Sequence, residues 1–346
     1  DGEAESVIVE IARAREQGKD LRELRQLWML DPNGKPVFSG HGVQQDINTI
    51  LHPDFSDYRL ADYASERRLP MLFSRGCILN CTYCTYKWNQ VTQRTRTGED
   101  VFRELMGNVE RYDINEFVMV DDSLISHVTM KEVERFADLI IQSGKRFSWE
   151  IYGTRIDRRL TDPYVEKLAR SGLRMVRFGV ESFSSKVQKD MGKSANHELT
   201  DNILRMFHRA GVSVGIWLIY GYPVESDEDF EITAGWIEHN SGLLSDVCVN
   251  CFFPNEKYAH DRPGTVSNFS WDFVWQWQSQ QTNLDIRNKR FFRIMDVLEQ
   301  ERQRHPHRFG YSVGDPFYTH YFQRWDDEIA REAHERWKNT QLPLAD

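Results

Sequence analysis

Three of the five cysteines in the chain lie close together, in the stretch RGCILNCTYC at positions 75–84. Cys77, Cys81 and Cys84 follow the spacing Cys-x-x-x-Cys-x-x-Cys. A structural zinc site needs four ligands, usually supplied as two separated pairs. A redox-active pair would use Cys81 and Cys84 and leave Cys77 without a role. Three thiolates can also hold three irons of a [4Fe-4S] cluster, which leaves the fourth iron open for chemistry.

The two remaining cysteines are poor partners for the same metal. Cys248 and Cys251 lie in the strand-like segment DVCVNC, where positions three apart point to opposite faces. Cys251 has two interpretations. It could donate a hydrogen atom to a product radical in the interior, or it could be a small apolar core residue, the commoner role of a free cysteine.

The composition is that of a globular protein. The chain has 346 residues, of which 40% are hydrophobic and 28% charged. The net charge of -9 argues against nonspecific nucleic-acid binding, and the odd, low number of cysteines argues against a secreted disulfide framework. Because no apolar run could span a bilayer and no signal peptide is visible, we expect a cytoplasmic protein. The first residue is Asp1 rather than Met, so the chain can be a fragment of a longer protein.

Short β-rich segments alternate with helical patterns along the middle of the chain. This alternation predicts an α/β fold in which helices cover a parallel sheet. Six such units indicate a partial, TIM-like (βα)6 barrel, although a doubly wound sheet would give the same pattern. The segments are 69–74, 116–121, 147–153, 175–181, 212–221 and 246–253.

Several helix boundaries also have sequence signals. Thr129 and Glu132 have the spacing of a capping box, and Gly144 fits the end of that helix. Ser226 and Asp229 begin a later helix. In the N-terminal part, DPNG at 31–34 predicts a turn between two short strands.

The cysteines follow the first predicted strand, and in parallel α/β folds the chemistry gathers at such carboxyl ends. Gly76 can supply the unusual backbone torsion that a turn into the cysteine loop requires. Asp121 and Asp122 end the second strand. They could bind substrate or act as a general base, but loop and cap hydrogen bonding is the commoner role of Asp in such turns.

The three cysteines, with aromatic Tyr83 directly before the last, resemble the signature of the radical S-adenosylmethionine (SAM) enzymes. The resemblance covers roughly residues 69–265. It implies that the three thiolates hold a [4Fe-4S] cluster and that SAM binds the open iron. Reductive cleavage of SAM then gives a 5'-deoxyadenosyl radical, which takes hydrogen from a substrate. The resemblance also implies a small-molecule substrate and an electron donor such as flavodoxin or ferredoxin.

The same resemblance implies a set of SAM-binding residues. Tyr83 would pack against the adenine. The segment GVES resembles the family segment with an acidic residue facing SAM, and YGTRID contains an arginine typical of a subgroup, which could meet the SAM carboxylate or be a surface charge. GIWLIYGYP resembles the fifth-strand segment along the adenine. The residues implied by these three segments are Glu181, Ser182, Arg155, Gly215, Ile219, Gly221 and Pro223.

The N-terminal stretch, with GVES and the later MGK, is similar to the cobalamin-dependent radical SAM subgroup. Many members of that subgroup methylate unactivated carbon or phosphorus, while others rearrange substrates or form rings. The cobalamin-binding domain and its Asp-x-His-x-x-Gly signature are absent from these residues, so cobalamin is expected only if a further domain precedes Asp1.

We therefore expect three regions: an N-terminal linker or subdomain (1–68), a radical SAM partial barrel (69–265) and a C-terminal α-helical, aromatic-rich extension (266–346). Seven aromatic residues fall between Phe309 and Trp325; they would form a helical core or line a pocket. Radical methylation is the expected reaction, with rearrangement or ring formation as one alternative. A noncatalytic iron-sulfur or zinc-binding protein is the other.

Overall fold

A parallel sheet forms the centre of the computed structural model, which describes residues 3–42, 45–63, 67–84, 92–193, 196–269 and 276–313. The sheet has seven strands in the order β11-β10-β9-β8-β7-β6-β3. The strands are β3 (Arg68–Met71), β6 (Glu116–Met119), β7 (Ser148–Thr154), β8 (Leu173–Glu181), β9 (Ser213–Tyr220), β10 (Asp246–Cys251) and β11 (Gly310–Val313). Every pairing between them is parallel.

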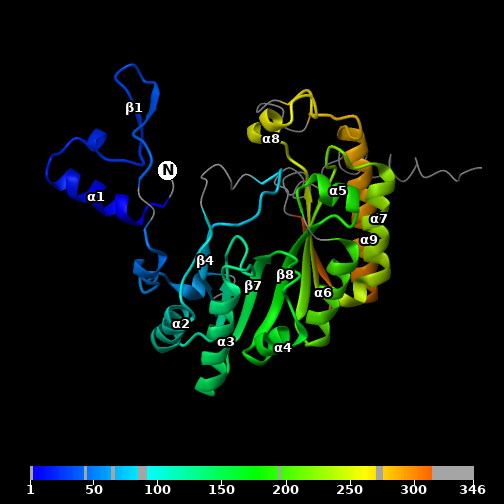
Figure 1. Ribbon diagram of the computed structural model, residues 1–346, viewed down its shortest axis with the longest axis horizontal. Coiled ribbons are helices and arrows are strands. Elements are labelled where there is room, and N and C mark those ends of the chain that lie inside the picture. Colours follow the sequence, from blue (N-terminus) through cyan, green and yellow to red (C-terminus); the bar gives the residue numbers. More distant parts are fainter. Residues whose placement is uncertain are drawn as a thin grey trace, which may run out of the picture.

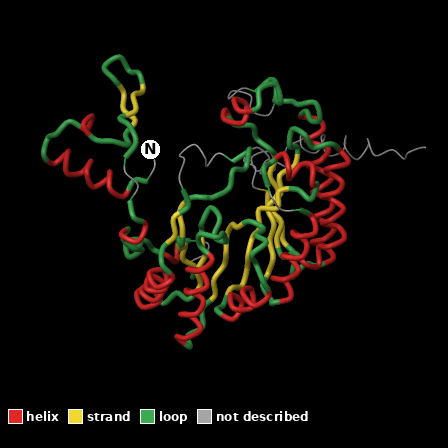
Figure 2. The backbone as a smooth tube through the Cα atoms, in the orientation of Figure 1, coloured by secondary structure: helices red, strands yellow, loops and turns green. Residues whose placement is uncertain are grey.

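The strand order identifies the architecture as a half-barrel. Each strand pairs with the next one along the chain, whereas a doubly wound sheet reverses its order at a switch point. Figures 1 and 2 show the helices along the outer side of the strands. The long helices are α2 (Gly98–Tyr112), α3 (Met130–Ser143), α4 (Asp162–Arg170), α6 (His197–Arg209), α7 (Asp227–Asn240) and α9 (Leu284–Arg304). The predicted partial barrel is confirmed.

The number of strands predicted for the sheet is wrong. The sequence indicated six strands, but β11 adds a seventh, pairing Gly310 with Asp246 and Val313 with Val249 of β10. The region expected to be a purely helical extension thus contributes to the sheet itself. It contains α9, then β11, and the aromatic-rich stretch beyond Val313 lies outside the described residues.

Two of the predicted helix-boundary signals are confirmed and one is wrong. Ser226 and Asp229 form the full capping box that begins α7, and Gly144 ends α3 with φ of 67°. Thr129 precedes α3 but makes no side-chain cap. Its expected partner Glu132 instead accepts a hydrogen bond from the backbone N–H of Gly98, at 2.9 Å. A tertiary contact has therefore replaced the local one.

The apolar core lies between the sheet and the outer helices. Trp149 of β7 is fully buried, and its ring meets that of Phe136 from α3 edge-on, with centroids 5.7 Å apart. The indole N–H donates to Ser171 Oγ at 3.2 Å, so this large side chain is buried without leaving its polar atom unpaired.

The N-terminal part lies to one side of the half-barrel (Figure 1) and contains α1 (Glu5–Glu16) and a hairpin of β1 (Trp28–Leu30) with β2 (Pro36–Phe38). The strands of the hairpin are antiparallel and the DPNG turn joins them, as predicted. Short elements complete the fold: 3-10 turns at Leu21–Glu23, Ile47–Thr49, Leu60–Asp62 and Ser241–Leu243, strands β4 (Ser74–Arg75) and β5 (Arg94–Thr95), and helices α5 (Ser185–Asp190) and α8 (Glu256–Asp261). None of the helices in the described ranges is long and apolar enough to cross a bilayer.

Candidate active site

The loop that carries the three cysteines leaves the carboxyl end of β3. Its base is closed by β4 and β5, which pair antiparallel. Gly76 begins the loop with φ of 94°, and a Cβ at this position would lie 2.7 Å from the backbone oxygen of Thr92. Because only glycine fits such a torsion and such a close approach, the role predicted for Gly76 agrees with the geometry.

None of the three cysteines of the loop forms a disulfide; Cys81 is buried and the other two are half-buried. Burial raises the pKa of Cys77, and the nearby Cys81 and Cys84 raise it further. The three sulfurs are therefore close enough to interact electrostatically.

Three thiolates in one loop match the donor set that holds three irons of a [4Fe-4S] cluster. Within the described ranges, no group of three His, Cys, Asp or Glu side chains is arranged to hold one metal ion. A tetrahedral zinc would need its thiolates roughly 3.8 Å apart, given a Zn–S distance of about 2.3 Å. A four-iron cluster binds one thiolate at each corner and so spaces its ligands more widely.

Tyr83 connects the cysteine loop to the end of β8. Its hydroxyl donates to Glu181 Oε1 at 3.0 Å. Lys193 Nζ donates to the same oxygen at 3.1 Å and lies 6.0 Å from the centre of the Tyr83 ring. Burial and then the negative charge of Glu181 hold the pKa of the Tyr83 phenol well above its usual value, so the phenol stays a donor.

The backbone aims Glu181 into this site. The register between β8 and β9 shifts between Gly179 and Glu181, and Glu181 itself has φ of 66°. A bulge of this kind redirects a side chain at the rim of a barrel. A Cβ on Gly179 would lie 2.8 Å from Glu181 Oε1, so the neighbouring glycine leaves the space that the carboxylate occupies.

The far side of the cysteine loop rests on the segment after β8. Thr82 N–H donates to the backbone oxygen of Met191 at 3.0 Å, and Thr82 Oγ1 lies 2.8 Å from the Tyr222 hydroxyl. Asn255 Nδ2 donates to the backbone oxygen of Tyr83 at 3.1 Å. Since Met191, Tyr222 and Asn255 follow three different strands, they fix the loop against the rim of the half-barrel.

A small apolar cluster brings two predicted SAM-binding residues to one place. Tyr83 and Ile219 both pack against a group of buried side chains that is separate from the main core. The buried members are Val187, Met191, Tyr222, Phe252, Tyr258 and Trp277. The ring of Tyr83 and the end of β9 therefore border a common apolar surface, as stacking on an aromatic cofactor requires.

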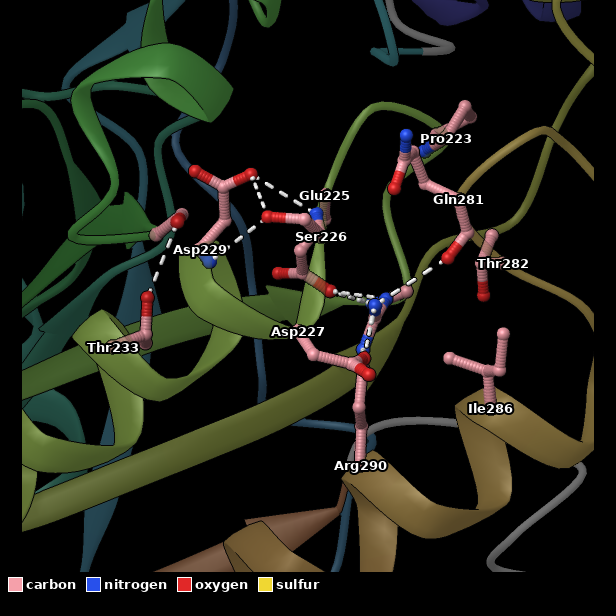
Figure 3. A network of polar contacts seen from close by, with 12 residues as sticks. Pro223, Glu225, Ser226, Asp227, Asp229, Thr233, Gln281, Thr282, Ile286 and Arg290 are labelled. Carbon is pink, nitrogen blue, oxygen red and sulfur yellow. Dashed lines mark hydrogen bonds and ion pairs between the residues drawn. The ribbon is translucent and has the colours of Figure 1, made fainter.

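The turn after β9 contains Gly221 and Pro223. Gly221 has φ of 72°, and its N–H donates to Glu225 Oε2 at 2.6 Å. Figure 3 shows Glu225 facing Arg290 of α9, where the guanidinium lies 3.1 Å from the same carboxylate oxygen. The carbonyl of Pro223 accepts from Ser279 Oγ at 2.7 Å.

Three predicted SAM contacts are not brought into this group. Gly215 lies at the opposite half of β9, paired with Asp246 at the start of β10; six residues separate it from Gly221, which is roughly 20 Å in a strand. Arg177 and Asp246 side chains occupy the space beside it. The hydroxyl of Ser182 is fully buried and lies 3.2 Å from Thr233 Oγ1. The expected contact of Gly215 with adenine and that of Ser182 with SAM do not fit these positions.

The third of these residues, Arg155, directly follows the carboxyl end of β7. Its Nε lies 3.6 Å from Asp157 Oδ2, with 16% of the arginine side chain exposed. Asp157 also pairs with Arg159 at 3.0 Å. Arg155 is thus half-buried and paired with an acidic side chain, and its contact with the SAM carboxylate stays a prediction.

Asp121 has a structural role at the exit of β3. The buried carboxylate accepts from the N–H of Phe73 at 3.2 Å and from Ser74 Oγ at 2.6 Å, and Ser74 N–H also donates to it. Burial raises the pKa of Asp121 to about 6. Asp122 is exposed. The loop-bonding interpretation of Asp121 thus fits, and its use as a substrate contact does not.

Cys251 is half-buried at the end of β10 and packs against the main core, which favours its interpretation as a core residue. Cys248 is buried, and its sulfur lies 3.8 Å from Asn250 Nδ2. This pair shares one face of β10, as strand alternation predicted.

Sequence reasoning missed Lys193, Asn255 and Glu225. The segment MGK was noticed only as part of a resemblance, and nothing in it marks the lysine as the partner of Glu181. Asn255 and Glu225 follow β10 and β9, so their position after apolar strands was a usable signal. Their partners lie far away in sequence, and a local pattern cannot identify them.

A sequence model described as the Radical SAM superfamily matches residues 71–237. This range runs from the end of β3 into α7 and includes the three cysteines, Tyr83 and Glu181. The chain therefore carries a radical SAM domain, as the cysteine motif predicted.

Two curated proteins with similar sequences are methyltransferases. The bacteriochlorophyllide d C-12(1)-methyltransferase of Chlorobaculum tepidum is 25% identical over 247 residues, or 69% of this chain and 52% of that protein. The cytidylyl-2-hydroxyethylphosphonate methyltransferase of Streptomyces wedmorensis is 28% identical over 165 residues, or 46% of this chain and 30% of that protein. The chain spans about half the length, or less, of these relatives.

Solved structures with the same fold include two cobalamin-dependent or cobalamin-bound enzymes. The radical SAM methyltransferase TsrM from Kitasatospora setae, with tryptophan substrate and a SAM analog bound, has a TM-score of 0.58 and 16% identity, and the match covers 72% of this chain and 50% of that one. A second TsrM structure contains cobalamin and a [4Fe-4S] cluster. The cobalamin-dependent SAM radical enzyme OxsB with aqua-cobalamin has a TM-score of 0.61 and 15% identity over 82% of this chain and 41% of that one. At these identities the likeness concerns the fold.

Proposed function

We propose that the protein is a radical SAM enzyme in which Cys77, Cys81 and Cys84 hold a [4Fe-4S] cluster. The observation that carries the proposal is the link between the cysteine loop and the end of β8: Tyr83, one residue before the last cysteine, donates to buried Glu181. A loop that only bound iron for folding would have no need of a buried carboxylate, an ammonium and an apolar surface beside it.

The cluster would supply one electron that cleaves SAM to a radical able to take hydrogen from an unactivated carbon. The residues of the chain bind and orient. Tyr83 and Ile219 offer an apolar surface to the adenine, while the Glu181 carboxylate and the Lys193 ammonium offer an acceptor and a donor to the polar groups of SAM. Burial of this pair excludes water, which strengthens such polar contacts.

Radical methylation of a small molecule is the reaction that we propose. Two curated relatives are methyltransferases, and TsrM, a structural neighbour, is a radical SAM methyltransferase, which supports this proposal. Rearrangement or ring formation without methylation uses the same residues and stays the second candidate. Cobalamin would be needed only by a longer protein that includes a domain to bind it.

We also propose the division into a linker region (1–68), a radical SAM partial barrel (69–265) and a C-terminal extension (266–346), with β11 of the extension completing the sheet. An electron donor such as flavodoxin or ferredoxin would reduce the cluster.

Electron paramagnetic resonance of the anaerobically reconstituted, dithionite-reduced protein tests the proposal. We expect a [4Fe-4S] signal that changes when SAM is added, and formation of 5'-deoxyadenosine from SAM under reducing conditions. A Cys248→Ala variant is the matched control, because it removes a buried thiol outside the loop. A cluster whose spectrum ignores SAM would favour a noncatalytic iron-sulfur protein and overturn the proposal.

A further inference from the structure

We propose that Arg290 and Glu225 are positioning residues for SAM, because their buried ion pair fixes the Gly221–Pro223 turn from the C-terminal helix α9. The inference rests on the proposed function, since it concerns a turn that would border the adenine. Arg290 lies 65 residues beyond Glu225 and outside the residues matched by the family model, which end at 237.

Both side chains of this ion pair are almost completely buried. The side chains of Arg290 and Glu225 are 3% and 1% exposed, and their charged atoms lie 3.1 Å apart. The second arm of the guanidinium donates to Asp227 Oδ1 at 2.8 Å, as Figure 3 shows. Arg290 thus joins α9 to the end of the segment that leads from β9 into α7. Such a fork requires arginine geometry, which lysine cannot reproduce.

Glu225 transmits this constraint to the turn. The oxygen that faces Arg290 is also the acceptor for Gly221 N–H, at 2.6 Å. Gly221 needs this support because its backbone has φ of 72°. The carboxylate therefore holds the peptide group at the point where β9 ends, two residues after Ile219.

Arg287, one turn earlier on α9, covers the other side of Gly221. A Cβ on Gly221 would lie 2.8 Å from Cγ and Cδ of Arg287. The guanidinium of Arg287 lies 4.0 Å from the centre of the Trp277 ring and donates to the Trp277 carbonyl at 3.0 Å. Trp277 belongs to the apolar cluster that Tyr83 and Ile219 contact. Two arginines of α9 therefore border the turn, one through charge and one through packing.

The charge on Glu225 depends on Arg290. Burial raises the pKa of Glu225, Arg290 and the Gly221 N–H lower it, and Asp229 and Asp227 of α7 raise it, which together leave the pKa at about 7. Without the arginine, the pKa would rise further, so the carboxyl group would hold its proton at higher pH and become a weaker acceptor for Gly221 N–H. The turn would then lose its fixed geometry, whereas Cys77, Cys81 and Cys84 lie on a separate loop and should still bind iron.

Equilibrium dialysis with methyl-labelled SAM tests the inference on the full, anaerobically reconstituted chain. We expect Arg290→Gln and Glu225→Gln each to weaken SAM binding about tenfold at pH 8, a typical size for coupling through a packed element. Iron content should equal that of the wild type in both. Lowering the pH from 8 to 6 should weaken SAM binding by the wild type but leave Glu225→Gln unchanged.

Two variants on the same helix separate positioning from stability. Arg293 pairs with Glu238 and Glu231 of α7 but does not contact the turn, so Arg293→Gln should bind SAM like the wild type. Val297 is buried, and Val297→Ala should lower the melting temperature without changing SAM affinity. Glu225→Gln preserves the shape of the side chain and is the second variant should Arg290→Gln fail to fold.

The outcomes of these measurements distinguish the role of the Arg290–Glu225 pair from the proposed function. If the wild type forms a cluster and binds SAM, but Arg290→Gln or Glu225→Gln binds it equally well, the inference is overturned and the proposed function stands. If SAM affinity falls in Val297→Ala as much as in Arg290→Gln, the pair contributes only stability and the inference is again overturned. A wild type that forms no SAM complex overturns both proposals.

Discussion

The hydroxyl of Tyr83 lies 3.0 Å from Glu181 Oε1, although the two residues are 98 positions apart in the chain. One belongs to the cysteine loop and the other ends β8, so the contact joins the proposed cluster ligands to the proposed SAM contacts. Lys193 meets the same oxygen, and together the three side chains form a compact polar group in a largely apolar surrounding.

Replacing Glu181 by Gln should weaken SAM binding and leave the cluster intact. Loss of a charged hydrogen-bond acceptor in a buried position is worth about 1.5–3 kcal/mol, or roughly 10- to 100-fold in affinity. Labelled SAM in equilibrium dialysis measures the affinity, and iron analysis checks the cluster. Tyr83→Phe keeps the ring and should have a smaller effect; unchanged SAM affinity in Glu181→Gln would remove this residue from the site.

Replacing Cys81 by Ala should abolish cluster assembly. Only two thiolates would then remain in the loop, and a [4Fe-4S] cluster with an open iron needs three. After reconstitution we expect the variant to lose most of its iron and its paramagnetic signal. Cys248→Ala, which removes a thiol from β10, should retain both. A stable cluster in Cys81→Ala would contradict the ligand assignment.

Replacing Gly76 by Ala should impair the cysteine loop. The torsion at this residue is left-handed and a Cβ would meet the Thr92 backbone, which together should cost about 1–3 kcal/mol. We expect a lower melting temperature and less bound iron. Gly235→Ala is the matched control: nothing lies within 4 Å of its added Cβ, so the change in α7 should raise stability by about 0.5–1 kcal/mol. Equal effects of the two substitutions would argue against the role of Gly76.

Asp121 should give the protein a measurable pH dependence of stability. Its pKa is raised to about 6 by burial, against about 3.9 in an unfolded chain. The folded state therefore binds more protons in this window, so the contribution of Asp121 is fully present below about pH 4 and is lost as the pH rises through 6. The free energy of unfolding of the wild type, relative to Asp121→Asn, should fall by about 2 kcal/mol between pH 4 and pH 7. Denaturant titrations at several pH values measure this difference, and a constant difference would disprove it.

The features that were predicted correctly from the sequence are those that local residue patterns determine. Alternating apolar segments located six strands of the half-barrel, and the Ser226–Asp229 box located the start of α7. The strand β11, with the sequence GYSV, lacks the apolar run of its neighbours and was missed. Thr129 and Glu132 had the spacing of a capping box, but the Glu132 carboxylate accepts a hydrogen bond from Gly98 of α2 instead. Residue spacing cannot reveal such a tertiary contact.

Residues of the candidate site were likewise predicted only where a local sequence segment marks them. Tyr83 and Glu181 were predicted because each lies in a recognisable segment at the carboxyl end of a strand. Gly215 lies in the same segment as Gly221, and only the register of β9 with β10 shows that it belongs to the other end of the strand. Lys193 and Arg290 depend on contacts across the fold, which no single segment contains.

The order of the strands has a consequence for how the protein is made. Each strand of the sheet pairs with the one before it in the chain, so the nascent sheet can grow one edge at a time as synthesis proceeds. The cysteine loop emerges early, beside β3, whereas α9 and β11 emerge after every other strand. A ribosome that has delivered the first six strands holds a chain with the proposed iron ligands in place but without Arg290, which fixes Glu225 and the Gly221 turn. Synthesis of α9 and β11 would thus complete a rigid rim after the proposed cluster loop has been made.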